Sequence, residues 1–231
     1  RQQVTMATST SIDTPLGMQG TGVTATSIQQ VRDALLDGQV RDESSVSGYW
    51  TSNQSALENA QAQRGEFLNN NGTTGSNAQG FSDQLNGLFS SFQGLATSPT
   101  SISARQNVIN QAQSLASGFN NASQQLSALN GALNTSVSDN VTKANQLLTQ
   151  IANLNDQIAK ATASGGTAND LVDSREQALE NLAGLVNIQT ATNTNGTVDV
   201  SIGGTQLISG NKTLDTLQTY DPGNGQLLVR T

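Results

Sequence analysis

The sequence predicts a mainly α-helical protein, a long helical bundle or coiled coil that ends in a small C-terminal β-hairpin unit. Three observations predict this fold class. Apolar residues recur at alternating spacings of four and three, glycine-rich segments separate these stretches, and the apolar period becomes twofold near residue 188. We divide the chain into an extended N-terminal arm at 1–27, a helical bundle at 28–187 and a β-hairpin unit at 188–231.

The arm and the first helix follow from composition and spacing. Residues 1–27 are rich in Thr, Ser and Gly, which predicts extended and irregular structure. Ser27 and Gln30 have the spacing of a capping box, so we expect a helix to begin there and to continue to about residue 67. The segment at 69–80 is rich in Asn, Gly and Thr and predicts a break.

Two more helices are expected before residue 161. The first covers 81–95, and Ser103 with Gln106 offers a capping box for the second. A helix of this length needs partners that bury its apolar seam. The expected bundle seam consists of leucine and isoleucine at heptad spacings: Leu126, Leu129, Leu133, Leu147, Ile151, Leu154 and Ile158.

The positions between these apolar residues carry Asn, Gln and Thr instead of the Glu and Lys pairs of a solvated coiled coil. Uncharged polar groups can form hydrogen bonds in an interface without the desolvation cost of buried charge. We therefore expect Gln146, Asn153 and Gln157 to form a face that contacts neighbouring subunits.

After a turn at 164–167, the sequence predicts a short helix and then strands. Asp170 and Asp173 mark the helix start, and the helix is expected to end near residue 186. Asn195-Gly196 is a strong hairpin signal. The expected strands are 186–192, 197–202, 205–209, and a further pair at 214–220 and 226–230.

Composition excludes several classes of function. The chain has no Cys and no His, so thiol chemistry, disulfides and the usual acid–base side chain near neutral pH are absent. Net charge is −7 and the ten Lys and Arg are scattered, which argues against nucleic-acid binding. No long apolar run or signal-peptide core is present, so no membrane partner is expected. We expect the chain to bind no metal or cofactor. We also expect it to be a fragment of a longer protein.

The only cluster of carboxylates is Asp170, Asp173, Glu176 and Glu180. Their spacing places them on one helix face, where a pair of acids for hydrolysis can be imagined. The structural interpretation is stronger: acids in a first helical turn satisfy free N–H groups and the helix dipole. Arg175 and Glu176 are then expected to be surface charges, and the chain is not expected to be an enzyme.

Tyr49 and Trp50 are adjacent in the first expected helix. Large aromatic side chains contribute much of the apolar area of a core. We expect them to be a core anchor and its more hydrated neighbour instead of a ligand platform.

Four segments, in order, resemble one known family. They are GTGVTATSIQQVRDALLDGQVR (20–41), ARQNVINQAQSLASGFNNASQQL (104–126), the segment 144–188, and NGTVDVSIGGTQLISG (195–210). The third is the most specific, because it contains IANLNDQI and the NDLVDSRE run. Together they resemble the flagellar hook-associated proteins of the FlgK family over about residues 20–210.

This resemblance implies a structural subunit of the bacterial flagellum. Members of the family form a ring at the junction between hook and filament, so the implied partners are copies of the chain itself, the hook protein and the neighbouring hook-associated protein FlgL. It also implies export by the flagellar type III pathway to an extracellular location, with an export chaperone bound through a terminal segment outside this sequence. The family's terminal helices and middle β domains are expected to lie outside it as well.

Alternatives from other classes remain open at this point. Within the flagellum, the chain could be a flagellin or a FlgL-like second junction subunit. Outside it, the heptads also suit a secreted coiled-coil protein, although a receptor hairpin would lack the β unit and a translocon subunit would carry an apolar membrane segment. An adhesin or glycan-active protein would need a functional acid pair, which loss of activity in Asp173→Asn would reveal.

Overall fold

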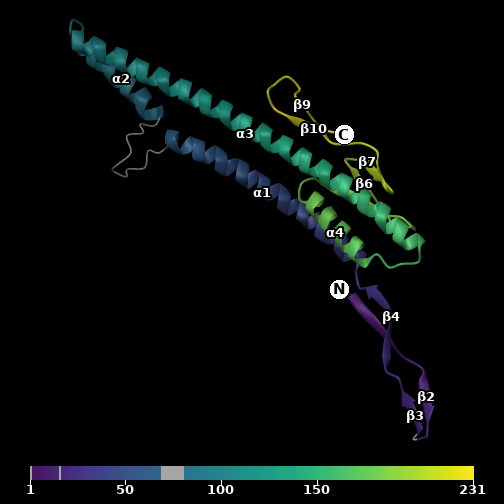
Figure 1. The fold of residues 1–231 in the computed structure, drawn as a ribbon. Helices are drawn as coiled ribbons and strands as arrows, with labels where there is room; N and C mark the ends of the chain where they lie inside the picture. Colours follow the sequence, from purple (N-terminus) through teal and green to yellow (C-terminus); the bar gives the residue numbers. More distant parts are fainter. Residues whose placement is uncertain (1, 16, 69–80) are drawn as a thin grey trace. The chain divides into compact units, whose positions relative to one another are not determined.

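The computed structural model describes residues 2–15, 17–68 and 81–231 (Figure 1). It is mainly α-helical with small strand units, which confirms the predicted fold class. The chain forms two compact units, which contain residues 1–50, 139–220 and 229–231, and residues 51–138 and 221–228. The break expected at 69–80 lies outside the described residues.

The N-terminal arm of the first unit is built of two antiparallel strand pairs. β1 (Gln2–Thr8) pairs with β4 (Val23–Gln30), and β2 (Ser11–Thr14) pairs with β3 (Gly17–Gly20). The helix start expected at Ser27 is wrong, because Ser27 pairs with Thr5 in the β1–β4 ladder. The strands therefore extend three residues beyond the arm boundary that the sequence predicted at residue 27.

Helix α1 (Ala34–Leu68) begins after Asp33 instead. The Asp33 Oδ1 accepts a hydrogen bond from the backbone N of Leu35 at 2.9 Å, as an N-cap side chain does. Three glycines, Gly38, Gly48 and Gly65, lie inside this helix. Gly48 is half-buried and lies against Gly184, the residue immediately after α4 (Asn169–Ala183).

In the second unit, α2 (Phe81–Thr97) packs on the N-terminal part of α3 (Ile102–Ala163). The rings of Phe81 and Phe119 meet edge to face with centroids 4.5 Å apart. The capping box expected at Ser103 and Gln106 is wrong, since both residues lie inside α3. Ser101 caps the helix, because its Oγ accepts from the backbone N of Ala104 at 3.3 Å.

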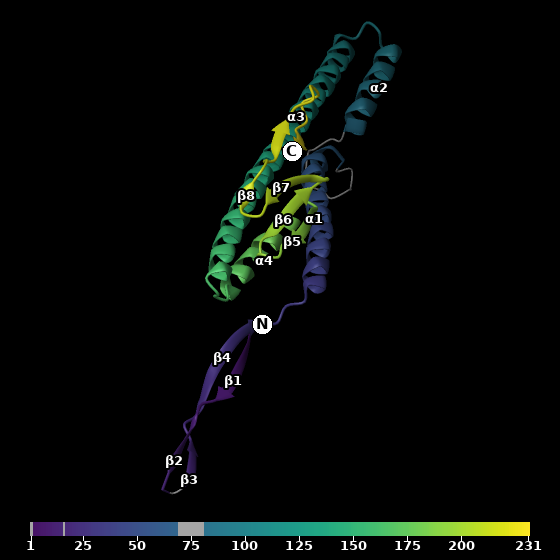
Figure 2. The ribbon, with the colours of Figure 1, turned by 90° about the vertical axis from the view of Figure 1, so that its right-hand side faces the viewer.

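The hydrophobic core lies in the first unit, between the C-terminal part of α3, helix α4 and a four-stranded sheet (Figure 2). Burial of this apolar surface is the main favourable contribution to the fold. Leu148, Ile151, Leu179, Leu182, Leu207 and Ile208 are the largest apolar side chains that are fully buried there.

The sheet has the antiparallel order β5-β6-β7-β8, with strands at Ile188–Thr192, Val198–Ile202, Thr205–Ser209 and Lys212–Thr213. The predicted Asn195-Gly196 hairpin joins β5 to β6, and Gly196 has the positive φ of +80° that this turn needs. The expected final strand pair is present but shorter, as β9 (Gln218–Tyr220) and β10 (Leu228–Arg230).

Candidate assembly surface

A cluster of paired charges joins α1 to α4. The Arg41 Nη1 lies 2.8 Å from the Glu176 Oε2, and the Arg41 Nη2 donates to the Thr190 Oγ1 of β5 at 3.3 Å. Arg175 contacts the other oxygen of the same carboxylate at 3.4 Å. Glu176 therefore stands between two guanidinium groups, which holds the two helices and the sheet edge together.

The expectation that Arg175 and Glu176 are surface charges is wrong. Arg175 is 4% exposed and Glu176 is 8% exposed. Burial lowers the pKa of Arg175, because desolvation disfavours the charged form, and the neighbouring Glu176 opposes this shift. A buried charge needs a partner, and the sequence could not indicate this pairing because Arg41 lies 135 positions before Glu176.

Asn155 is a second buried polar centre that the sequence interpretation missed. It is fully buried in α3, and its Nδ2 donates to the carbonyl oxygens of Val198 at 2.7 Å and Gly210 at 2.6 Å. Its Oδ1 accepts from the backbone N of Val198 and from Arg175, both at 3.2 Å. One amide thus satisfies backbone groups of β6 and of the turn between β7 and β8, together with a buried cation.

Other asparagines of α3 bind backbone groups in the same way. In the first unit, the Asn145 side chain donates to the Leu217 carbonyl and accepts from the Leu217 N, both at 2.9 Å. In the second unit, the Asn134 side chain donates to the Gly225 carbonyl at 2.8 Å and accepts from the Leu227 N at 2.9 Å. Part of the amide-rich surface of α3 therefore holds the chain's own C-terminal segments.

The three residues of the expected subunit-contact face lie elsewhere on α3. Gln146, Asn153 and Gln157 are exposed, and their spacing places them on one line of the helix. That line is opposite to the side on which Leu148 and Ile151 are buried.

The expected seam residues differ along the helix. Ile151, Leu154 and Ile158 are buried, and Leu147 packs against the same core. In the second unit, Leu126 is 62% exposed and Leu133 is also exposed, while Leu129 is half-buried.

The two acids of the expected helix start, Asp170 and Asp173, do not form an acid pair with Glu176. Asp170 lies in the first turn of α4, and Asp173 is paired with Arg32 at 3.0 Å. In the described ranges, no group of three or more acids or other metal-binding side chains is placed to hold a metal ion. None of the described helices combines the length and the apolar character needed to cross a membrane.

Tyr49 and Trp50 do not form the core anchor that the sequence suggested. Trp50 is 65% exposed and Tyr49 is similarly exposed, with the two rings in edge-to-face contact. The expectation is wrong because α1 turns its small and polar residues, among them Gly48 and Arg41, toward the first unit's interior.

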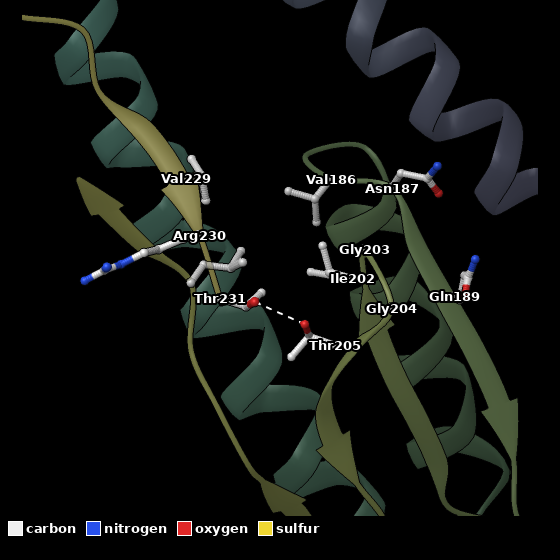
Figure 3. Close-up of a pocket in the computed structure, with 11 residues that line it drawn as sticks. Val186, Asn187, Gln189, Ile202, Gly203, Gly204, Thr205, Val229, Arg230 and Thr231 are labelled. Carbon is white, nitrogen blue, oxygen red and sulfur yellow. Dashed lines mark hydrogen bonds between the residues drawn. The ribbon is translucent and has the colours of Figure 1, made fainter. Parts of the chain in front are cut away.

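An open pocket of about 700 Å³ lies between the β5–β7 sheet and the end of the chain (Figure 3). Val186, Ile202 and Val229 supply apolar walls, and the Thr231 Oγ1 and Thr205 Oγ1 form a hydrogen bond of 3.2 Å across it. Among the described residues that line it, Arg230 is the one with a charged side chain. The lining therefore offers no pair of groups for acid–base chemistry.

The arrangement of long helices and a hairpin sheet corresponds to one known family. The family model described as "Flagellar hook-associated protein FlgK helical domain" matches residues 68–230. The chain belongs to the FlgK family. The resemblance that the four sequence segments suggested is thereby confirmed.

Individual FlgK relatives agree with this assignment. "Flagellar hook-associated protein 1" of Bacillus subtilis is 31% identical over 190 residues, which cover 82% of this chain and 36% of the relative. The protein of the same name from Salmonella typhimurium is 28% identical, over 87% of this chain and 35% of the relative. The chain thus spans about a third of the length of these FlgK proteins.

A solved FlgK structure has the same fold. The flagellar hook junction protein FlgK from Burkholderia pseudomallei superposes with a TM-score of 0.66 and 30% sequence identity. The match covers 85% of this chain and 33% of that protein. The bundle-plus-hairpin architecture is therefore that of the FlgK helical domain.

Proposed function

We propose that this chain is part of a structural subunit of the bacterial flagellum, which forms the hook–filament junction as a ring of copies. The observation that carries this proposal is the match of residues 68–230 to the FlgK helical domain, together with the likeness to a protein named as a flagellar hook junction protein. The partners are other copies of the chain, the hook protein and the hook-associated protein FlgL.

The subunit-contact face is the line of Gln146, Asn153 and Gln157 on α3. These exposed amides can form hydrogen bonds with a neighbouring subunit at a low desolvation cost, because they carry no charge. The buried core behind them fixes their helix, so the face is presented as a rigid surface.

A second contact is proposed at Leu126, Leu129 and Leu133 in the second unit. The two exposed leucines have heptad spacing, which is typical of a surface that packs on another helix. In the assembled protein, this stretch continues the bundle seam formed by Leu147, Ile151, Leu154 and Ile158.

The role is structural and not catalytic. The protein acts outside the cell after export by the flagellar type III pathway. An export chaperone binds another segment of the full-length protein. The acids that could have formed a hydrolytic pair are engaged otherwise: Asp173 pairs with Arg32, and Glu176 is buried between two arginines. The family favours this role over a flagellin, a FlgL-like subunit, a non-flagellar secreted coiled coil or an adhesin.

The test introduces Lys at Gln146, Asn153 and Gln157 together in the full-length gene. Desolvation and repulsion of like charges in the ring should impair filament attachment and swimming, while circular dichroism and the thermal melt of the purified protein stay unchanged. Lys at Asn86, Ser90 and Gln93, which are exposed on α2, adds the same charge elsewhere as a control. Normal motility of the α3 triple variant would refute this contact face.

A further inference from the structure

Four Asn-Gly pairs lie in the described part of the chain, at Asn86, Asn130, Asn195 and Asn224. In such a pair the backbone nitrogen of the glycine can attack the side-chain amide carbon of the asparagine, because glycine presents no side chain that blocks the approach. Two pairs lie inside α2 and α3, where the helical hydrogen bonds fix the backbone and hold that nitrogen away.

The two remaining pairs lie in turns and differ in what their glycine nitrogen contacts. The Gly196 N donates to the carbonyl oxygen of Asn193 at 3.0 Å, and this neutral oxygen cannot take its proton. The Gly225 N donates to the Asp221 Oδ1 at 3.2 Å, which is within the reach of a general base. Asp221, Asn224 and Gly225 are exposed, so water can enter.

We propose that Asn224 is a self-modification site of this protein, converted to aspartate and isoaspartate with Asp221 as the general base. The Asp221 carboxylate takes the proton of the Gly225 N as that nitrogen bonds to the Asn224 Cγ. The Cγ–Nδ2 bond then breaks, the proton passes to the departing nitrogen, and ammonia leaves. Water opens the resulting cyclic imide at either carbonyl, which gives aspartate or isoaspartate without any oxidation or reduction.

The modification acts on a segment that α3 holds in place. The Gly225 carbonyl accepts from the Asn130 Nδ2 at 2.9 Å and from the Asn134 Nδ2 at 2.8 Å. Isoaspartate inserts an extra methylene into the main chain at residue 224, one residue before this carbonyl. The carbonyl is thereby displaced, and the 221–227 segment is released from α3.

The experiment incubates the complete chain at mildly alkaline pH and follows each Asn-Gly peptide by mass spectrometry over time, with isoaspartate methyltransferase to detect the rearranged product. We expect conversion at Asn224 to be faster than at Asn195. Asp221→Asn should slow conversion at Asn224 about a hundredfold, at the low end of what a lost general base costs. It should leave the rate at Asn195 unchanged.

Asp215→Asn is the matched control, since Asp215 is also an exposed carboxylate that accepts a backbone hydrogen bond, from Thr216. This variant should convert Asn224 at the original rate. The proposal is overturned if Asn195 converts as fast as Asn224, or if Asp221→Asn leaves the rate at Asn224 unchanged. An increased rate in Asp221→Asn, as expected if the loop merely loosened, overturns it equally.

Discussion

The backbone of Gly184, just after α4, approaches Gly48 of α1 so closely that no side chain fits between them. A Cβ placed on Gly48 would lie 2.9 Å from the Gly184 carbonyl carbon and would overlap its carbonyl oxygen. Glycine in the middle of a helix costs about 1 kcal/mol of helix stability relative to alanine. In α1, the missing side chain of Gly48 permits the close approach of the end of α4, at this cost in helix stability.

We therefore expect Gly48→Ala to destabilise the protein by about 1–3 kcal/mol, as overpacking of a filled interior does. Chemical denaturation followed by circular dichroism measures this change. Gly38→Ala is the matched control in the same helix, since a Cβ there meets no atom within 4 Å. That variant should gain about 0.5–1 kcal/mol from helix propensity. Equal effects of the two substitutions would refute the close packing of Gly48.

Asn155→Leu should cost about 3 kcal/mol or more. The substitution leaves the Val198 N, the Val198 carbonyl and the Arg175 guanidinium without this buried partner, and each such loss costs about 1–3 kcal/mol. The free energy of unfolding measured with urea tests this value. Asn153→Leu changes an exposed neighbour and should stay within about 0.5 kcal/mol of the original protein.

Glu176→Gln should cost about 3–5 kcal/mol, because it leaves the guanidinium groups of Arg41 and Arg175 buried beside a neutral amide. Asp173→Asn breaks the exposed pair with Arg32 and should cost less than about 1 kcal/mol. Thermal melts of the two variants provide the comparison. A Glu176→Gln protein as stable as Asp173→Asn would contradict the role given to the buried cluster.

The pH dependence of stability should include a contribution from Asp156. Hydrogen bonds from Lys160 and Asn211 lower the pKa of its carboxyl below the ordinary value of 3.8. The folded-state pKa therefore lies below the unfolded one, so the contribution is present above the unfolded value and is lost as the pH falls through the folded value. Asp156→Asn should be less stable than the original protein at neutral pH, and the difference should disappear in acid. A difference that persists in strong acid would exclude this explanation.

Periodicity in the sequence was sufficient for the long helices, the short α4 and the Asn195-Gly196 hairpin, because these depend on local spacing and turn chemistry. It failed where distant segments decide the environment. Trp50 was expected in the core, but α1 turns Gly48 and Arg41 toward the interior and leaves Trp50 exposed. Glu176 was expected at the surface, but it is buried and paired with Arg41.

Asn155 shows what local information could still have revealed. It follows Ile151 by four positions and precedes Ile158 by three, so it lies beside Leu154 on the core-facing stripe of the helix. An amide in such a place needs buried hydrogen-bond partners. Which strands supply them could not be known before the sheet was positioned against α3.

The asparagines of α3 also determine how the protein responds to its surroundings. Asn134, Asn145 and Asn155 hold their strands and turns through neutral amide groups, which neither titrate nor attract counterions. Salt weakens exposed ion pairs but leaves such bonds nearly unchanged. The hold of α3 on these segments is therefore expected to change little between fresh water and brine, or with acidity, unlike the ion pairs elsewhere in the first unit.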